Sequence, residues 1–237
     1  FSFGENYLSK LNNFDIIFRS PSCRPDLPEI MLEVMHGAIL TSEIEMVLKL
    51  AAEGHQIIAV SRKENLEFTS HKNIFYYAVD LANETEIESF SQEIALKFKH
   101  IDVVIHNAGA IVNKPFSEIS AAEFMYVYQV NVFGVAALNK AVLPFMKKGS
   151  HVVTVSSMGG IQGSLKFPGL AAYSSSKGAV ITLSELLAEE YKAQGVAFNV
   201  LALGAVQTEM LEEAFPGYQA PILPNEMANY IADFALN

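Results

Sequence analysis

A tyrosine and a lysine four residues apart, Tyr173 and Lys177, are the side chains of this sequence best suited to carry chemistry. On a helix, residues with this spacing stand one turn apart on the same face. A free tyrosine titrates near ~10, and an ammonium group within about 4 to 6 Å lowers that pKa by roughly 1 to 3 units. The pair therefore predicts proton transfer near neutral pH. Taken alone, the spacing is a weak signal, because it is more often that of a solvent-exposed pair.

The composition restricts the classes of protein to consider. The 237 residues, 51% hydrophobic and 18% charged, suffice for one large domain with a buried core. A net charge of -10 argues against nucleic acid as a partner. Cys23 is the only cysteine and no Cys/His cluster has metal-ligand spacing, so we expect neither an intrachain disulfide nor a metal site. Because the sequence shows neither a long apolar run nor a secretory signal, we expect no membrane span and a reducing, cytoplasmic location.

From residue 30 onward, short apolar runs alternate with longer amphipathic segments, which is typical of a parallel sheet wrapped by helices. Residues 1–29, with three prolines, predict an irregular N-terminal arm, and residues 30–237 a single domain. The expected strands are Ile30–Met35, Gln56–Ser61, Ile74–Val79, Ile101–His106, His151–Ser156 and Val196–Ala202. The expected helices are Ser42–Glu53, Glu84–Lys99, Ala121–Lys147 with a bend near Pro144, Ala172–Gln194 and Glu226–Leu236.

Polar or small residues follow several of these strands. Ligands of open parallel sheets bind beyond the carboxyl ends of the strands, so these positions are candidates for a site. Asn107, Ala108 and Gly109 follow the fourth strand and permit close approach of a flat ligand, although an ordinary turn explains them as well. Ser157 follows the fifth strand, where its hydroxyl could donate to a carbonyl or simply form a turn.

Two further polar residues have alternative explanations. Asn131 lies in an otherwise apolar helix, where a buried amide must find partners, and core hydrogen bonding explains it as well as catalysis does. Asp80, after the third strand, could accept from the exocyclic amine of a nucleotide or could cap the next helix.

Together these fragments resemble the short-chain dehydrogenase/reductase family, from about residue 46 to the end of the chain. The resemblance implies an α/β fold with a doubly wound, Rossmann-like parallel sheet that holds NAD or NADP in a single domain. The fragments, in the family's order, are Asp80 with Leu81, Asn107 with Ala108 and Gly109, Asn131, Ser157, and Tyr173 with Lys177.

The resemblance also implies a role for each matching residue. Tyr173 would be the general acid or base of hydride transfer between the cofactor and a ketone or secondary alcohol. Lys177 would lower the pKa of that tyrosine and hold the nicotinamide ribose. Ser157 would orient the carbonyl, and Asn131 would hold a water in the proton relay. Thr208 matches the position that contacts the nicotinamide end, while Asp80 to Leu81 and Asn107 to Gly109 would line the cofactor site.

The preference between NAD and NADP depends on the end of the second strand. An acidic residue there would accept from the ribose 2′-hydroxyl of NAD, and none is present. Arg62 stands there instead, and its guanidinium suits the 2′-phosphate of NADP. We therefore expect NADP rather than NAD, with an exposed surface arginine as the alternative.

The chain departs from the family pattern in its substrate region. Sixteen positions separate Ser157 from Tyr173, more than is usual, and the extra residues predict a loop rich in glycine and apolar side chains that forms one wall of the substrate pocket. After the sixth strand, apolar residues predict either a mobile lid or the core face of a short helix. They are Met210, Leu211, Phe215 and Tyr218. Both walls favour an apolar carbonyl or alcohol substrate.

The glycine-rich cofactor loop is the largest departure. Only its first glycine is matched, by Gly37, while Thr41 and Glu43 occupy the other two glycine positions. A carboxylate about 4 Å from the pyrophosphate would cost roughly 1 to 4 kcal/mol. Either the chain is a non-catalytic family member with a weakened cofactor site, or residues 1–45 are not the authentic start of the enzyme. We favour the second, and expect the chain to end before the family's last strand.

The leading hypothesis is an NADP-dependent oxidoreductase, and the alternative is a non-catalytic subunit or fragment. A nucleotide-sugar epimerase or dehydratase is a weaker third possibility, because this chain lacks a large C-terminal substrate region. The segments 121–147 and 172–194 resemble the helices through which family members pair. They predict a homodimer or homotetramer.

Overall fold

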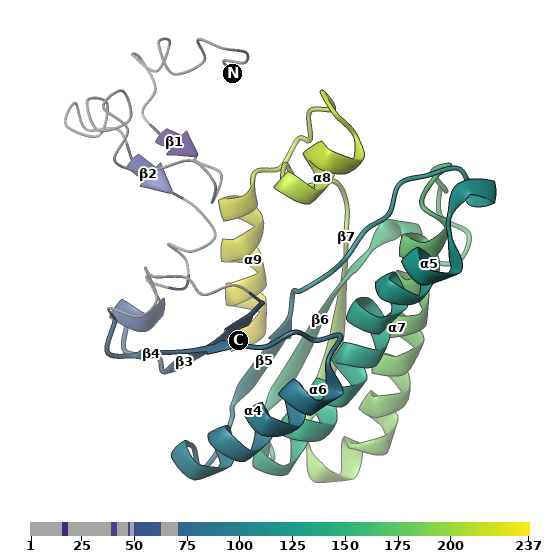
Figure 1. Cartoon of the computed structure of the whole chain (residues 1–237). Coiled ribbons are helices and arrows are strands. Elements are labelled where there is room, and N and C mark those ends of the chain that lie inside the picture. The colour runs from purple at the N-terminus through teal and green to yellow at the C-terminus, as the bar shows by residue number, and fades with distance from the viewer. Residues whose placement is uncertain (1–15, 19–38, 42–46, 48–49, 63–70) are drawn as a thin grey trace.

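The computed structural model describes residues 16–18, 39–41, 47, 50–62 and 71–237, and Figure 1 shows their arrangement. Strands and helices alternate there as the sequence predicts. The strands are β1 (Ile16–Phe18), β2 (Ile39–Thr41), β3 (Ile57–Ser61), β4 (Ile74–Ala78), β5 (Val103–His106), β6 (His151–Ser157) and β7 (Ala197–Leu203). The helices are α4 (Glu84–Lys97), α5 (Ala121–Tyr128), α6 (Gly134–Val142), α7 (Ala171–Glu190), α8 (Glu209–Ala214) and α9 (Pro224–Leu236).

All strand pairs in this part of the chain are parallel. β5, β6 and β7 form one sheet in that order, β3 pairs with β4, and β1 pairs with β2. The predicted first strand, Ile30–Met35, lies outside the described residues. β1 falls within the segment predicted to be an irregular arm. The parallel strands and the helices between them give the Rossmann-like α/β fold expected from the sequence, in a single domain.

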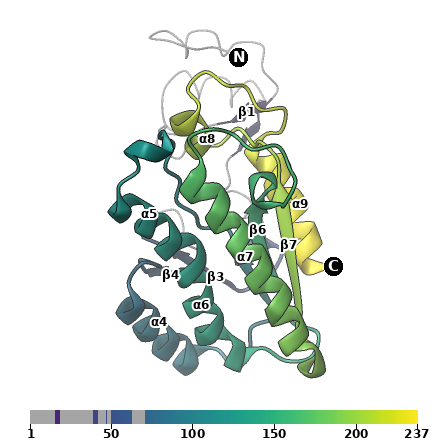
Figure 2. The ribbon, with the colours of Figure 1, turned by 90° about the vertical axis from the view of Figure 1, so that its right-hand side faces the viewer.

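Helices cover both faces of the β5–β6–β7 sheet, and Figures 1 and 2 show α9 on one face with α4, α6 and α7 on the other. Val152 and Phe198 pack against side chains of α7. Val153 and Leu201, which lie an odd number of positions from Val152 and Phe198 along the same strands, point the other way and pack against α9. Because successive side chains of a strand alternate between faces, burial on both faces explains why these strands are largely apolar.

The predicted long helix is interrupted twice. Ser120 caps α5 in a reciprocal arrangement with Glu123, and the helix then widens into a π-helical turn, Gln129–Phe133, before α6. A 3-10 turn at Leu143–Phe145 ends the run at the predicted position of the bend. By length and composition alone, the run Ala121–Phe145 could cross a membrane. That criterion is weak evidence, because core helices of soluble proteins meet it as well.

Candidate active site

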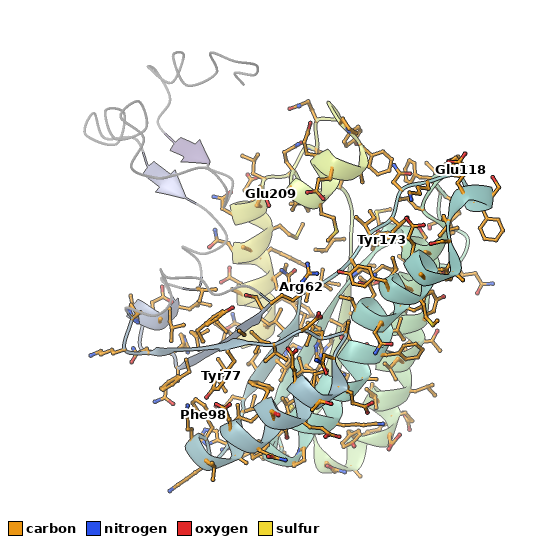
Figure 3. All side chains as sticks on the ribbon, in the orientation of Figure 1. Arg62, Tyr77, Phe98, Glu118, Tyr173 and Glu209 are labelled. Carbon is orange, nitrogen blue, oxygen red and sulfur yellow. The ribbon has the colours of Figure 1, made fainter. Side chains whose placement is uncertain are left out.

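Tyr173 and Lys177 lie in the first two turns of α7, beside the carboxyl end of β6. Ser157, the last residue of β6, lies close enough to the Tyr173 hydroxyl to influence its pKa. The Lys177 ammonium lies 5.7 Å from the centre of the Tyr173 ring, and only 5% of this lysine is exposed. Figure 3 shows Tyr173 toward the upper end of α7, on the side of the molecule that carries α8. The structure therefore brings Ser157, Tyr173 and Lys177 together and excludes a solvent-exposed pair. The fourth predicted residue, Asn131, lies nearby, since a Cβ added to Gly109 would be 3.6 Å from its Oδ1 and 3.7 Å from the Lys177 Nζ.

The pKa of Tyr173 is raised above its ordinary value, so the predicted lowering is wrong for this structure. Burial disfavours the phenolate and outweighs the opposing effect of the nearby Ser157 side chain. The Lys177 ammonium donates to the backbone carbonyl of Val155 over 2.8 Å, and burial lowers its own pKa to about 8. At neutral pH the site thus holds a protonated phenol beside a buried cation.

Two glycines let β6 approach α7 closely enough for the Ser157 contact. The turn after Ser157 places Gly160 against the α7 backbone, where an added Cβ would lie 2.6 Å from the Lys177 carbonyl carbon and 2.7 Å from the Gly178 nitrogen. A Cβ on Gly178 would in turn lie 3.0 Å from the Gly160 oxygen. Gly160, in the turn after Ser157, and Gly178, in α7, therefore set the distance between the strand that carries Ser157 and the helix that carries Tyr173.

Gly160→Ala is expected to destabilise the fold by about 2 kcal/mol, because overpacking against backbone leaves little room for relaxation. Thermal or urea unfolding measures this change. Gly204→Ala is the matched control, since its added Cβ would meet only the Met158 sulfur, at 3.7 Å. Equal stability of the two variants would show that the close approach at Gly160 is not required.

Asn131 lies in the π-helical turn and is 2% exposed. Its amide nitrogen donates to the Ala110 carbonyl and to the Ser176 hydroxyl, each over 2.9 Å, and its oxygen accepts from the Ala110 nitrogen over 2.7 Å. Both amide hydrogens are therefore used within the protein. The hydrogen bonds predicted for a core amide are present, and they fix the turn after β5 to α7.

His106 was not predicted as a site residue, yet it supports the same turn. It ends β5, is 4% exposed, and its Nε2 lies 2.9 Å from the Asn139 Oδ1. Burial lowers the pKa of His106 more than the Asn139 contact raises it, so the ring is neutral. A histidine at the end of an otherwise apolar strand was the available signal in the sequence.

The predicted cofactor residues near Lys177 occupy the carboxyl edge of the strands. Asn107, Ala108 and Gly109 directly follow β5. A Cβ on Gly109 would lie 3.7 Å from the Lys177 Nζ. Thr208 caps α8, and its hydroxyl accepts from the Leu211 nitrogen over 3.2 Å.

The residues predicted for the nucleotide end have protein partners in this structure. Arg62, labelled in Figure 3, follows β3. Its Nη1 donates to the Tyr126 hydroxyl over 2.7 Å. The Asp80 carboxylate accepts from the Ala82 nitrogen over 2.9 Å, while Asn83 is the cap of α4.

The remaining residues of the predicted nucleotide end are Leu81, Thr41, Gly37 and Glu43. A Cβ added to Gly134 would lie 2.6 Å from the Leu81 carbonyl oxygen, so that glycine allows the Leu81 backbone to approach the π-helical turn. Thr41 ends β2. Gly37 and Glu43 lie outside the described residues.

The donors at this edge fit a phosphorylated dinucleotide. The Lys177 ammonium has three hydrogens, and within the described residues it donates one of them, to the Val155 carbonyl. Its other hydrogens are available to the hydroxyls of a ribose. The Arg62 guanidinium supplies a cation at the end of β3. Within the residues that the structure describes, no group of three or more His, Cys, Asp or Glu could hold a metal ion.

Comparisons with known proteins agree with this geometry. The family model for short chain dehydrogenases matches residues 44–219. The chain is 31% identical over 189 residues to an NADPH-dependent pterin aldehyde reductase of Arabidopsis thaliana, covering 74% of this chain and 76% of that protein. It is 35% identical over 163 residues to an oxidoreductase of Botryotinia fuckeliana, covering 66% of this chain but only 58% of that protein. A diacetyl reductase of Staphylococcus aureus is 32% identical over 136 residues, which are 56% of this chain and 52% of the reductase.

Solved structures show the same relationship. A short chain dehydrogenase from Salmonella enterica superimposes with a TM-score of 0.70 at 27% identity, covering 79% of this chain and 82% of that one. A short chain dehydrogenase from Escherichia coli in complex with NADPH gives 0.68 at 27% identity, covering 79% of this chain and 83% of that one. Sequence, fold and site therefore agree that this chain belongs to the short chain dehydrogenase family.

Proposed function

We propose that this protein is an oxidoreductase that transfers a hydride between NADP(H) and a ketone or secondary alcohol. The observation that carries the proposal is the buried contact of Ser157 with Tyr173 beside the Lys177 ammonium. The Arabidopsis and Staphylococcus relatives are named as reductases of carbonyl compounds, and the solved Escherichia coli structure holds NADPH, which supports the cofactor and the reaction class.

Each residue has a task that follows from its surroundings. NADP(H), when bound, would supply or accept the hydride. Tyr173, whose raised pKa keeps it protonated at neutral pH, donates its proton to the carbonyl oxygen of the substrate. Ser157 donates a second hydrogen bond to that oxygen and so orients it. Lys177 stabilises the phenolate that remains and offers its free hydrogens to the ribose.

The substrate we propose has an apolar body around its carbonyl. Exposed apolar side chains are concentrated in the segment between β6 and α7. They are Met158 (53% exposed), Ile161 (42%), Leu165 (76%) and Phe167 (53%). Exposed apolar groups beside a catalytic residue favour burial of apolar substrate surface on binding.

A spectrophotometric assay tests the proposed function. The protein is mixed with NADPH and a panel of apolar ketones and aldehydes, and loss of the reduced cofactor is followed. We expect turnover with at least one member of the panel and slower turnover with NADH. Absence of turnover with every substrate and both cofactors, in protein that is folded, would contradict the proposal.

Arg62→Ala is expected to weaken NADPH binding by about 10- to 100-fold, because a charge-assisted hydrogen bond contributes about 1.5 to 3 kcal/mol. NADH binding should change little, since that cofactor has no 2′-phosphate. Fluorescence titration of both cofactors measures the difference. Lys72→Ala, just before β4 at the opposite end of the strands, is the control. Equal losses for both cofactors would rule out recognition of the 2′-phosphate.

We further propose a homodimer or homotetramer in a cytoplasmic setting. Large apolar side chains are exposed on the helices expected to pair. They are Met125 (62% exposed), Phe133 (52%) and Leu186 (64%). Light scattering of the purified protein measures the oligomeric state, and a monomer at all concentrations would contradict this part of the proposal.

A further inference from the structure

Asn113 connects the loop after β5 to helix α8. Its amide nitrogen donates to the backbone carbonyl of Ala214, the last residue of α8, over 2.5 Å. The last carbonyls of a helix lack partners within the helix, and Ala214 is 9% exposed, so this carbonyl needs a donor from elsewhere. A residue 101 positions away in the sequence supplies it.

The same loop is fixed to two other segments. The Lys114 backbone nitrogen donates to the Gly169 carbonyl over 3.1 Å, at the end of the segment between β6 and α7. The Lys114 ammonium pairs with Glu123 in the first turn of α5. Gly169 has φ +90°, and an added Cβ would lie 2.0 Å from the Asn113 Oδ1. Only glycine therefore allows Asn113 to reach α8 past this segment.

Helix α8 borders the catalytic lysine. A Cβ added to Gly109 would lie 3.7 Å from the Lys177 Nζ and 3.8 Å from the methyl group of Met210 in α8. Figure 1 shows α8 beyond the strand ends, linked to them through β7. What holds α8 in place consequently also sets the space above the catalytic residues.

We propose that Asn113 is a positioning residue that fixes α8 over the active site and so determines how well substrate binds. The contact joins the loop after β5 to α8, with Gly169 providing the space. The kinetic part of this inference rests on the proposed function, whereas the structural part does not.

Asn113→Asp is the sharpest test, because it keeps the side-chain volume and removes the donor to Ala214. Asn229→Asp is the matched control: Asn229 donates in the same way to a helical carbonyl, that of Asn225 in α9, over 3.0 Å. Hydrogen exchange followed by mass spectrometry reports the opening of residues 209–214. We expect amide hydrogen exchange in residues 209–214 to accelerate about 5-fold in Asn113→Asp, because that is the effect of losing one hydrogen bond. Asn229→Asp should leave the exchange of these residues unchanged.

Two kinetic readouts complete the test. The KM for the carbonyl substrate should rise by about 5-fold in Asn113→Asp, while kcat changes by less than about 2-fold. Gly169→Ala should give the same pattern, and the double variant Gly169→Ala with Asn113→Asp should add nothing to it. Unchanged exchange in residues 209–214, or a fall in kcat at constant KM, would overturn the proposal. If wild-type protein has no activity but the exchange result holds, the proposed function fails and the role of Asn113 in fixing α8 stands.

Discussion

Tyr173→Phe is expected to lower kcat/KM for carbonyl reduction by about 10²- to 10⁴-fold, the usual contribution of a positioned proton donor. Removal of one oxygen leaves the ring in place, so packing at the start of α7 should persist. Because the proposed function assigns Tyr173 to the substrate rather than to the cofactor, NADPH affinity should stay within about 2-fold of wild type. Steady-state kinetics combined with a cofactor titration separates the two effects.

Tyr191→Phe is the control for this substitution. Tyr191 lies at the carboxyl end of the same helix, where its ring packs against Phe198. This variant should keep wild-type kinetics. Retention of more than about one tenth of wild-type kcat/KM in Tyr173→Phe would contradict the role of this tyrosine as the proton donor.

Lys177→Met is expected to lower kcat/KM to a similar extent, because it removes both the cation beside the phenol and the donor for the ribose. It should also weaken NADPH binding, which Tyr173→Phe should not. Met fills a similar volume, so the buried position remains occupied. Cofactor affinity therefore distinguishes the two variants, and an unchanged affinity in Lys177→Met would contradict the assignment of a cofactor contact to this lysine.

Lys177→Met should also have a pH signature in stability. Burial lowers the pKa of Lys177 from 10.5 to about 8, so between these values the unfolded chain holds a proton that the folded chain has released. The free energy of unfolding of the wild type therefore rises with pH through this window, relative to the variant. Below pH 8 the full penalty of burying the charge is present, of the order of 3 kcal/mol.

Urea unfolding at several pH values measures this effect. The stability of Lys177→Met relative to wild type should be greatest below pH 8 and should decline toward pH 10.5. Lys192→Met is the control, because the Lys192 side chain is 72% exposed and has lost little hydration. A difference between wild type and Lys177→Met that does not vary with pH would show that the lysine is not buried as a cation.

The elements that position the site could be predicted because they depend on local patterns. Apolar runs covered on both faces give β6 and β7, and the predicted strand limits differ from the observed ones by a single residue. The prediction that polar residues gather at the carboxyl ends of parallel strands needs only the strand order. It placed Ser157 at the end of the fifth predicted strand, and the family resemblance paired it with Tyr173.

Features that depend on tertiary packing could not be predicted. The pKa of Tyr173 reflects how deeply the ring is buried, and a four-residue spacing contains no information about depth. The π-helical turn that holds Asn131 arises where Gly134 approaches the Leu81 carbonyl, a contact between distant segments. Asn113 was missed for the same reason, since its partner Ala214 is remote in sequence.

The comparisons give no support to the alternative of a non-catalytic subunit, since the named relatives are oxidoreductases and reductases. The glycine-rich loop that should hold the pyrophosphate remains a prediction, as Gly37 and Glu43 lie outside the described residues. Binding of NADPH by this chain is consequently the step on which the proposed function depends most.

Titration of the wild-type chain with NADPH, followed by cofactor fluorescence, is the most direct test of that step. The proposed function predicts saturable binding that weakens in Lys177→Met and Arg62→Ala and persists in Tyr173→Phe. No saturable binding to folded wild-type protein, even at high micromolar NADPH, would contradict the claim that this chain is an NADP-dependent oxidoreductase.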